Sequence, residues 1–314
     1  MDLSLIERNT KEIITHEELY ELLKKKPLAI TYCGYEVSGP VHIGTLVAIQ
    51  KQVDFQNAGL KVKVLLADLH TFLNRKGDEK FIEEQLQIWK ETLMKAGLRE
   101  AEFIKGTDFQ FNRDYIRDVL TLGLKTTLMR ARRSMQEIAR DLEHARVSQV
   151  IYPLMQIADI KALDVDIAHG GLEQRKIHML AREILPELNY KKFVCIHTPL
   201  LSSLQGPEQK MSSSKPETII AVDEKPESIR KKIASAYCPP KDVSSNVVLQ
   251  ICEYLIFPKK GKIEIERKEK FGGDIFFNSY DELERYYLDG KLHPQDLKNA
   301  VAEALIEILE PMRS

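Results

Sequence analysis

Short apolar runs alternate with longer segments of helical periodicity along the first 200 residues. Segments 46–57 and 80–96 repeat apolar residues at the helical spacing, whereas the runs between such segments are typical of buried strands. The expected strands are 28–36, 61–67, 102–105, 165–168 and 193–197. Because strands joined by helices pair in parallel, this alternation predicts an α/β fold with a doubly wound parallel sheet covered by helices.

Three regions of different composition follow one another along the chain. Residues 1–200 hold the alternation, which a helical insertion interrupts at 112–144. Residues 201–224 are rich in serine, glycine, proline and lysine and have no apolar period, which predicts a mobile loop or linker. Residues 225–314 carry several helix-like patterns. This last region is expected to form a smaller, mainly helical second domain.

The composition excludes several classes of protein. The 46 Lys+Arg against 47 Asp+Glu leave a net charge of −1, so any nucleic acid must bind at local patches. The four cysteines form no CxxC pair and the histidines show no ligand spacing, which argues against a disulfide framework and a metal site. No apolar run approaches the roughly 20 residues that span a bilayer. We therefore expect a cytoplasmic protein without a membrane segment.

Two segments have the composition of phosphate-binding loops. Residues 38–45 (SGPVHIGT) lie where the first strand turns into a helix, whose N-terminus is expected to offer unpaired N–H groups to a phosphate. His42 is a hydrogen-bond donor there, and small residues such as Gly44 let a nucleotide approach the backbone. In 210–215 (KMSSSK), two lysines bracket three serines, a pattern suited to clamping a triphosphate. Each segment alone is equally typical of a plain turn or a solvated linker, but together they favour one nucleotide site.

Tyr152, Gln156 and Asp159 follow one another at spacings of four and three residues, so they share one face of the helix predicted over 147–163. The intervening positions are mostly apolar, and polar groups in such a helix need hydrogen-bond partners. An exposed polar stripe on an amphipathic helix would have the same spacing. The pattern alone leaves open whether these side chains bind a ligand.

Residues 42–45 (HIGT) and 210–214 (KMSSS) resemble the two signatures of class I aminoacyl-tRNA synthetases, HIGH and KMSKS. Longer segments resemble archaeal-type tyrosyl-tRNA synthetases, and they cover almost the whole chain. They include Tyr32 and residues 65–70, 125–134, 150–156, 170–183 and 292–303. The resemblance implies a Rossmann-like catalytic domain with a helical insertion, followed by a C-terminal, mainly helical anticodon-binding domain.

The resemblance also implies a two-step reaction, in which ATP activates L-tyrosine and the tyrosyl-adenylate then esterifies tRNA(Tyr). Tyr32 and Asp159 would hydrogen-bond the phenol of the substrate, and His70 would line the same pocket. The α-ammonium group would be held by Tyr152, Gln156 and Gln174.

ATP would bind at the two signatures. By resemblance, the nucleotide contacts are Gly34, His42, Gly44, Lys210 and Ser213. Catalysis would come from positioning and from charge stabilisation, supplied by a magnesium ion that ATP carries and by His42, Thr45, Lys210, Ser212 and Ser213.

The same resemblance implies contacts with tRNA in two places. Arg133, Arg175 and Lys176 match positions close to the first base pair of the acceptor stem. Phe271, His293 and Asp296 match positions that stack on and hydrogen-bond the guanine that opens the tyrosine anticodon. Similar enzymes are homodimers through the helical insertion, so a homodimer contact is expected at 112–144.

Few positions depart from the family pattern. Thr45 replaces the second histidine of the first signature, and Val37 replaces the proline before Ser-Gly. Thr45 keeps a hydroxyl donor but is shorter than histidine, so we expect the rate or the ATP affinity to suffer. The last residue of the second signature is Ser214, as in similar archaeal sequences, and Lys215 follows it directly.

Three alternatives remain open from the sequence. A tryptophan-activating relative would share the fold, although Tyr32 and Asp159 favour tyrosine. A nucleotidyltransferase of the same signature superfamily would ignore tRNA, and the second domain argues against it. A catalytically impaired paralogue would bind tRNA or tyrosine without adenylation, and Thr45 is the only sequence feature that favours this interpretation.

Overall fold

The computed structural model describes residues 2–135, 144, 146–211 and 215–313, with the backbone alone for 208–210. The chain forms two compact units: unit 1 is Met1–Ser38 with Lys51–Pro199, and unit 2 is Gly39–Gln50 with Leu200–Ser314. The short segment 39–50 therefore groups with the C-terminal residues, whereas the division predicted at residue 200 keeps it with the N-terminal region.

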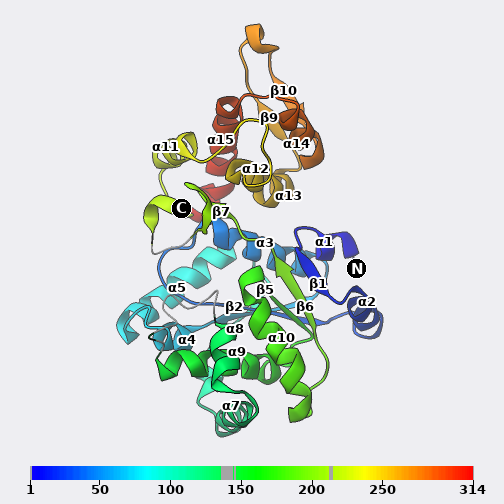
Figure 1. The fold of residues 1–314 in the computed structure, drawn as a ribbon, viewed down its shortest axis with the longest axis vertical. Helices are drawn as coiled ribbons and strands as arrows, with labels where there is room; N and C mark the ends of the chain where they lie inside the picture. The colour runs from blue at the N-terminus through cyan, green and yellow to red at the C-terminus, as the bar shows by residue number, and fades with distance from the viewer. Residues whose placement is uncertain (1, 136–143, 145, 212–214, 314) are drawn as a thin grey trace. The chain divides into compact units, whose positions relative to one another are not determined.

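Unit 1 is built on a six-stranded sheet in the order β1-β6-β5-β2-β3-β4 (Figure 1). Five strands are parallel, and β1 (Glu12–Ile14) joins the edge antiparallel to β6. The parallel strands are β2 (Ile30–Tyr35), β3 (Lys61–Leu66), β4 (Glu102–Lys105), β5 (Ile167–Gly171) and β6 (Val194–Thr198). The predicted doubly wound parallel sheet is confirmed, with every expected strand present and β1 added.

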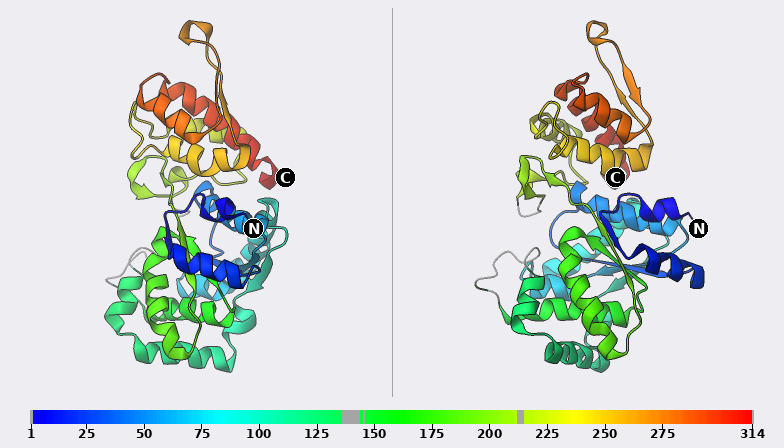
Figure 2. Two further views of the ribbon diagram at one scale, coloured as in Figure 1. Left: turned by 90° about the vertical axis from the view of Figure 1, so that its right-hand side faces the viewer. Right: turned by 45° about the vertical axis from the view of Figure 1, so that its right-hand side comes forward.

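Helices pack around this sheet (Figures 1 and 2). α9 packs against α4, α7, α8 and α10 and buries most of its residues from Tyr152 to Ile160. The helices are α1 (Leu3–Glu7), α2 (His16–Lys25), α4 (Asp68–Leu73), α5 (Glu79–Lys95), α6 (Thr107–Gln110), α7 (Arg113–Lys125), α8 (Leu128–Ser134), α9 (Val147–Ala162), α10 (Arg175–Ile184), and the short η1 (Leu172–Gln174) and η2 (Leu185–Leu188). α3 (Ile43–Asn57) begins in unit 2 and ends in unit 1.

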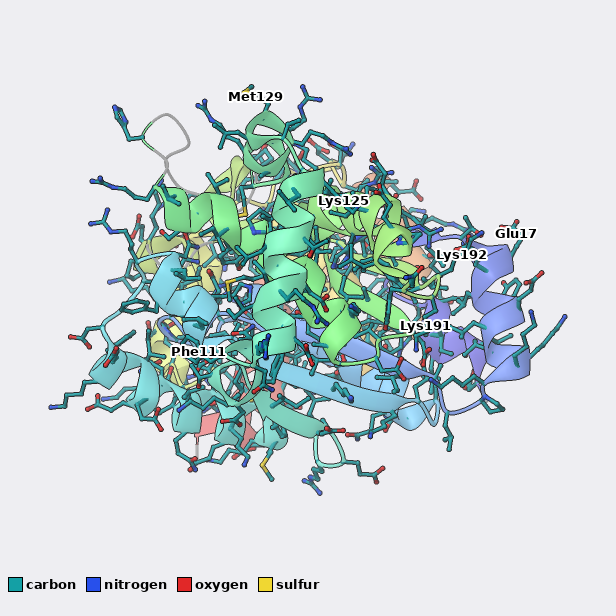
Figure 3. All side chains as sticks on the ribbon, turned by 90° about the horizontal axis from the view of Figure 1, so that it is seen from below. Glu17, Phe111, Lys125, Met129, Lys191 and Lys192 are labelled. Atoms are coloured by element: carbon teal, nitrogen blue, oxygen red, sulfur yellow. The ribbon has the colours of Figure 1, made fainter. Side chains whose placement is uncertain are left out.

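The insertion over 112–144 was predicted to be helical throughout. Up to Ser134 it consists of two helices, α7 and α8. Residues 136–143 and 145 lie outside the described residues. The chain leaves the helical conformation at Thr126 and Thr127, and the Thr127 side chain caps α8 by accepting from the Arg130 N–H at 3.3 Å. Figure 3 looks onto this helix pair, where Lys125 and Met129 are labelled. Exposed apolar side chains gather on it, which we call the apolar face: Ile116, Leu120, Leu124, Leu128 and Met129.

Unit 2 is mainly helical, as predicted for its C-terminal part. In the region predicted as a loop, β7 (Ser202–Ser203) pairs with β8 (Gly206–Lys210), and η3 (Pro216–Thr218) follows. β9 (Ile263–Ile265) and β10 (Ile275–Phe277) form an antiparallel pair. The helices are α11 (Pro226–Ser235), α12 (Val247–Ile251), the π-helical η4 (Cys252–Ile256), α13 (Phe257–Lys260), α14 (Tyr280–Leu288) and α15 (Pro294–Arg313). Of the helices in the described part of the chain, none is both long and apolar enough to cross a membrane.

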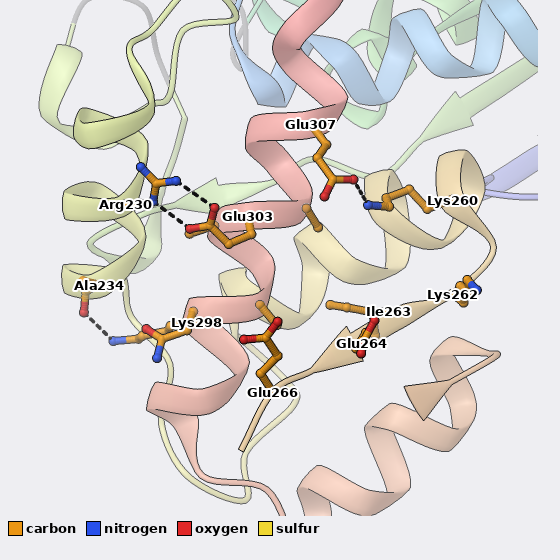
Figure 4. A pocket seen from close by; sticks show the side chains of 14 residues that line it. Arg230, Ala234, Lys260, Lys262, Ile263, Glu264, Glu266, Lys298, Glu303 and Glu307 are labelled. Atoms are coloured by element: carbon orange, nitrogen blue, oxygen red, sulfur yellow. Dashed lines mark hydrogen bonds and ion pairs between the residues drawn. The ribbon is translucent and has the colours of Figure 1, made fainter. Parts of the chain in front are cut away.

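Ion pairs tie α15 to its neighbours in unit 2 (Figure 4). Arg230 on α11 makes two hydrogen bonds to the Glu303 carboxylate, at 2.7 and 2.8 Å, and Lys260 on α13 pairs with Glu307. These side chains border a groove of about 460 Å³. These ion pairs therefore hold the second half of α15 from two sides.

Candidate active site

The order of the strands creates a switch point beside β2. The chain adds β3 and β4 on one side of β2 and then returns to add β5 and β6 on the other side. Ligands of doubly wound sheets bind at such points, outside the carboxyl ends of the strands. Tyr32 and Gly34 lie on β2, and Gln174 ends the short η1 that follows β5. The fold therefore brings residues from distant parts of the sequence to one place in unit 1.

Asp159 is the buried acid of this place, with no exposed surface. The Gln110 amide and the Tyr115 hydroxyl each donate a hydrogen bond to its Oδ1 at 2.8 Å, and Tyr32 is a further partner. Burial raises the pKa of Asp159 to about 7, and these hydrogen bonds limit the rise because they stabilise the carboxylate. The acid is thus poised between its neutral and charged forms near neutral pH.

Asp159 Oδ2 and His70 Nε2 are buried and lie 3.7 Å apart, and neither has a hydrogen-bond partner among the described residues. Burial lowers the pKa of His70 to about 4, so its imidazole is neutral at pH 7. Gln110 Nε2 lies 3.4 Å from His70 Nδ1, and a ring that accepts there carries its proton on Nε2. In that tautomer the two atoms offer one acceptor and one donor, which together match a hydroxyl group.

Gln110 and Tyr115 were not predicted from the sequence. Gln110 ends the one-turn helix α6, which follows β4, and Tyr115 lies in the first turn of α7. The sequence did contain a signal for Gln110, because this residue follows closely after a predicted parallel strand, where ligands of such sheets bind. Tyr115 carried no such signal, because only the packing of α7 on α9 brings it to Asp159.

A second cluster suits a cationic group. Tyr152 hydrogen-bonds Glu36, whose carboxylate also accepts from Asn74 Nδ2 at 2.8 Å. Gln156 Nε2 donates to Gln174 Oε1 at 3.0 Å. Carboxylate, phenol and amide oxygens are acceptors for an ammonium group. The predicted residues Tyr152, Gln156 and Gln174 thus belong to one polar region, to which the structure adds Glu36.

Gly34 has a steric role beside Tyr32. A Cβ atom at Gly34 would lie 3.0 Å from the Tyr32 hydroxyl, which is closer than such contacts normally come. The glycine therefore lets Tyr32 keep its position and leaves the backbone exposed at the end of β2. Its contact with ATP stays a prediction.

The first signature is held by the segment that follows the second signature, and both belong to unit 2. His42 forms a β-bridge with Ala221. The N–H of Ile43 donates to the Ile220 carbonyl at 3.0 Å, and the N–H of Val222 donates to the carbonyl of residue 41 at 2.9 Å. These bonds explain why 39–50 groups with the C-terminal residues.

The N-terminus of α3 does not offer the unpaired amides that were expected. The Ile43 N–H is taken by Ile220, the Gly44 N–H donates to His42 Nδ1 at 3.1 Å, and the Thr45 N–H donates to the His42 carbonyl at 2.9 Å. That expectation is therefore wrong for these three groups, because the chain itself caps the helix. These three amides are already paired, and the side chains of His42 and Thr45 are further donors at the first signature.

His42 is prepared as a hydrogen-bond donor. Burial lowers the pKa of His42 to about 4, so the ring is neutral at pH 7. Since Nδ1 accepts the Gly44 N–H, the single ring proton lies on Nε2. A Cβ atom at Gly44 would lie 3.0 Å from the ring, so the glycine secures this arrangement. The tautomer is thus set by the backbone of the signature itself.

The second signature is described only in part. The backbone of Lys210 ends β8, Met211 is buried, and Ser212 and Ser213 lie outside the described residues. A Cβ atom at Gly44 would meet the Met211 Cβ at 3.4 Å, so the start of the second signature lies against the first. Thr45 is half-buried.

The cationic residues expected at the acceptor stem lie on neighbouring helices of unit 1. Arg133 is exposed on α8, and Arg175 and Lys176 open α10. α8 packs against α10, and an ion pair between Arg130 and Glu183 joins them. The structure thus gathers side chains that are about 40 positions apart in the sequence.

Phe271, His293 and Asp296 line one pocket of about 600 Å³ in unit 2. Phe271 ends the short η5 (Glu269–Phe271) and is 59% exposed, while His293 and Asp296 lie at the start of α15. His293 Nδ1 also accepts the Gln295 N–H at 3.1 Å, so it caps that helix as well. Three cationic residues line the same pocket: Lys241, Arg267 and Lys291. An aromatic face, hydrogen-bonding edges and cations together suit a nucleotide base with its phosphate.

Comparisons with known proteins agree with this geometry. The family described as tRNA synthetases class I (W and Y) matches residues 24–310. The tyrosine–tRNA ligase of Methanocaldococcus jannaschii is 51% identical over 99% of this chain and 98% of its own. The ligase of the same name from Methanopyrus kandleri is 49% identical over 99% of this chain and 96% of its own.

A solved structure gives the same result for the fold. The tyrosyl-tRNA synthetase of Archaeoglobus fulgidus, crystallised with L-tyrosine, superposes with a TM-score of 0.96 at 48% identity, covering 99% of this chain and 97% of that one. Family, sequence and fold therefore agree along nearly the whole length. The chain belongs to the class I tRNA synthetases for tryptophan and tyrosine, and within them to the archaeal type of tyrosyl-tRNA synthetase.

Proposed function

We propose that the chain is a tyrosine–tRNA ligase that activates L-tyrosine with ATP and charges tRNA(Tyr). In the first step the tyrosine carboxylate attacks the α-phosphorus of ATP, the bond to the β-phosphate breaks, and pyrophosphate leaves with its magnesium ion. In the second step a hydroxyl of the terminal ribose attacks the carbonyl carbon of the adenylate, and AMP leaves.

The unpartnered pair of Asp159 Oδ2 and His70 Nε2 is the observation that carries the choice of tyrosine. The substrate phenol donates to the carboxylate oxygen and accepts from the imidazole, and Tyr32 completes the contact. Phenylalanine leaves both buried atoms without a partner, which costs about 1–3 kcal/mol for each group. The α-ammonium binds at the region of Tyr152, Gln156 and Gln174.

The ATP phosphates bind at the signatures in unit 2. His42 donates from Nε2 to a phosphate oxygen, and the Thr45 hydroxyl donates beside it. Lys210, Ser212 and Ser213 stabilise the charge that develops on the leaving pyrophosphate. Gly34 and Gly44 let the nucleotide approach the backbone. ATP brings the magnesium ion with it as part of the substrate.

The tRNA is bound at two places. Arg133, Arg175 and Lys176 contact the first base pair of the acceptor stem. The pocket of Phe271, His293 and Asp296 binds the first anticodon base, which stacks on the aromatic ring and hydrogen-bonds the Asp296 carboxylate. A carboxylate accepts two hydrogen bonds from the N1–H and the exocyclic amine of guanine, which other bases cannot supply in that arrangement.

The enzyme acts as a homodimer in the cytoplasm. The apolar face of α7 and α8 exposes a run of large side chains, and surfaces of this kind mark protein contacts. Cys33, Cys195, Cys238 and Cys252 are all free thiols, which suits a reducing compartment.

The test is amino-acid-dependent exchange of labelled pyrophosphate into ATP, run with tyrosine, phenylalanine and tryptophan. We expect exchange with tyrosine alone and its collapse in Asp159→Ala. Exchange with tryptophan would overturn the choice of substrate. Exchange with tyrosine without charging of tRNA would reduce the proposal to the first step.

If the wild-type chain shows no exchange, the variant Thr45→His distinguishes an impaired enzyme from one that uses another substrate. Restored exchange in Thr45→His would identify a catalytically impaired member of the family, and continued absence would point to another substrate. If the wild-type chain is active, we expect Thr45→His to keep or raise the rate, because the family signature carries histidine there.

A further inference from the structure

In unit 1, four polar side chains contact one another in a row, which we call the file: His178, His197, Glu12 and Arg175. His178 Nδ1 lies 2.9 Å from His197 Nε2, and the two rings stack with their centroids 5.0 Å apart. His197 Nδ1 lies 2.9 Å from Glu12 Oε1, and the same oxygen lies 2.6 Å from Arg175 Nε. Neither histidine has any exposed surface. Neither the tyrosine pocket nor the two signatures include Glu12 or these histidines.

Proton positions along the file follow from its chemistry. Burial lowers the pKa of His178 to about 3 and also lowers the pKa of His197, so both rings are neutral at pH 7. A carboxylate only accepts, which places the His197 proton on Nδ1, facing Glu12. His197 Nε2 then accepts from His178 Nδ1–H. The Glu12 oxygen thus lies between the imidazole of His197 and the guanidinium of Arg175 and is in close contact with both.

The backbone fixes Glu12 as firmly as the side chains do. Glu12 lies opposite His197 in the antiparallel register of β1 and β6, which lie side by side (Figure 1). The Lys11 N–H also donates to the His197 carbonyl at 2.7 Å. Glu12 is 26% exposed and Arg175 is 47% exposed, so the ion pair reaches from the interior to the surface. One end of the Arg175 guanidinium is anchored while the side chain remains accessible.

We propose that Glu12 and His197 are positioning residues for the acceptor end of tRNA, acting through Arg175. This inference rests on the proposed contact between Arg175 and the acceptor stem. The Glu12 carboxylate restrains the guanidinium on its Nε side through this ion pair, and the neighbouring His197 ring restrains Glu12. An arginine that is oriented beforehand loses less side-chain entropy when it binds a base edge or a phosphate.

The same helix offers a matched comparison. Arg182, two turns further along α10, makes two hydrogen bonds to the Glu18 carboxylate, at 2.8 and 3.0 Å. Its guanidinium also donates to the backbone carbonyl of Ile14, at 3.2 Å. This second pair ties α10 to α2 and β1 as a structural link. Glu18→Gln therefore removes a carboxylate from an arginine of α10 without touching Arg175.

The experiment compares Glu12→Gln, Glu18→Gln, Arg175→Ala and the double variant Glu12→Gln/Arg175→Ala in the full-length enzyme. Two readouts are taken: pyrophosphate exchange without tRNA, and kcat/KM for tRNA in aminoacylation. We expect Glu12→Gln to lower kcat/KM for tRNA about 5- to 20-fold and to leave exchange within about twofold. Glu18→Gln should leave both within about twofold, and the double variant should be no worse than Arg175→Ala alone.

His197 gives a further test. His197→Asn keeps a side-chain N–H near the place of Nδ1 and should retain most of the tRNA efficiency, whereas His197→Phe should match Glu12→Gln. A common loss in both His197 variants would contradict the inference.

The remaining outcomes distinguish failure of the positioning role of Glu12 from failure of the proposed contact between Arg175 and the acceptor stem. Unchanged tRNA kinetics in Arg175→Ala would show that the proposed acceptor contact is absent. A loss in Arg175→Ala without a loss in Glu12→Gln, or a double variant whose effects add, would overturn the positioning role alone. A parallel loss of exchange in Glu12→Gln would also overturn it, because Gln174 directly precedes Arg175 and the effect would then lie in tyrosine binding.

Discussion

Asp159 shows how a single residue is tuned by two opposing effects. Burial favours the neutral acid, whereas donors from Gln110, Tyr115 and Tyr32 favour the carboxylate. The result is a pKa of about 7, above the ordinary 3.8. The folded protein therefore binds a proton on Asp159 more tightly than the unfolded chain does, and it does so between about pH 4 and pH 7.

This tuning predicts the dependence of stability on pH. Because the pKa is raised by folding, the contribution of Asp159 to stability is greatest below pH 4 and is lost as the pH rises towards 7. Asp159→Asn carries no ionisable group, so its Tm relative to wild type should rise by about 2 °C or more between pH 5 and pH 8. Calorimetry at both values checks this.

The exposed carboxylate of Asp114 serves as the control, because it is the neighbour of Tyr115, which hydrogen-bonds Asp159. Asp114, whose side chain is 81% exposed, precedes Tyr115, and Asp114→Asn should show the same Tm difference from wild type at both pH values. If the Tm difference between Asp159→Asn and wild type is also the same at pH 5 and pH 8, the raised pKa of Asp159 is contradicted.

The residues of the proposed tyrosine pocket were predictable only in part. Tyr32 and Asp159 came from a resemblance, and the helical spacing placed Tyr152, Gln156 and Asp159 on one face. For Gln110 the sequence indicates only a place just beyond the end of a strand, since its hydrogen-bond role depends on His70 and Asp159 of other elements. Partner choice inside a pocket depends on packing, which periodicity does not report.

At the scale of elements, short segments deliver the pocket residues. α6 is only one turn long, yet it carries Gln110 to Asp159. Its start is fixed by Asp68, which accepts from the Thr107 N–H at 3.1 Å and from the Thr107 hydroxyl at 2.6 Å. Gly106 makes this turn possible, because a Cβ atom there would lie 2.6 Å from both the Asp68 and the Gln110 side-chain oxygens.

Gly106→Ala should therefore loosen the phenol contact. The added methyl group displaces Gln110 or Asp68, so we expect a loss of about 1–3 kcal/mol in stability and a raised KM for tyrosine. Denaturant unfolding and exchange kinetics measure the two effects. Gly123→Ala is the control, because its Cβ would meet only Leu154 Cδ1 at an ordinary 3.7 Å. Equal effects of both variants would argue against a local clash.

The apolar face leads to a prediction about assembly. Leu124 is 90% exposed, while Tyr115, Val119 and Leu122 of the same helix are buried. Leu124→Lys places a charge at the proposed contact and should raise the Kd of the homodimer by about 100-fold or more. Light scattering across a concentration series measures this. Ile88→Lys, at an exposed position of α5, should leave the dimer intact, and a dimer that survives Leu124→Lys would place the contact elsewhere.

Element boundaries separate what the sequence predicts from what it does not. The five parallel strands were predicted because short apolar runs between helical segments are typical of buried strands. β1 was missed, since three residues are too short for a period to be recognised. The break between α7 and α8 was also missed, although Thr127 before the next apolar residues is a typical helix start.

At the scale of the whole molecule, the tasks are divided between the units. Unit 1 contains the proposed tyrosine pocket and the proposed acceptor-stem residues, while unit 2 contains the first signature and the proposed anticodon pocket. From composition, the sequence predicted three regions, 1–200, 201–224 and 225–314. The composition does not predict that 39–50 groups with residues 200–314, because that grouping depends on backbone hydrogen bonds to residues 220 and 222.

The division predicts which step each variant affects. Phe271→Ala should lower kcat/KM for tRNA in aminoacylation about 10- to 100-fold, because a stacked base loses its platform. Exchange without tRNA is the reference reaction. Phe276→Ala is a matched control, since that ring is 55% exposed against 59% for Phe271 but does not line the pocket. Equal losses in both variants would contradict the assignment of the pocket.

The backbone bonds between 41–43 and 220–222 also restrict how such a gene can recombine. A single crossover near residue 200 would pass on His42 from one parent and its bridge partner Ala221 from the other. The inherited histidine would then be oriented by foreign backbone. A chimera that exchanges the C-terminal part therefore needs two further crossovers, at 38/39 and 50/51, so that the first signature is inherited together with the segment that binds it.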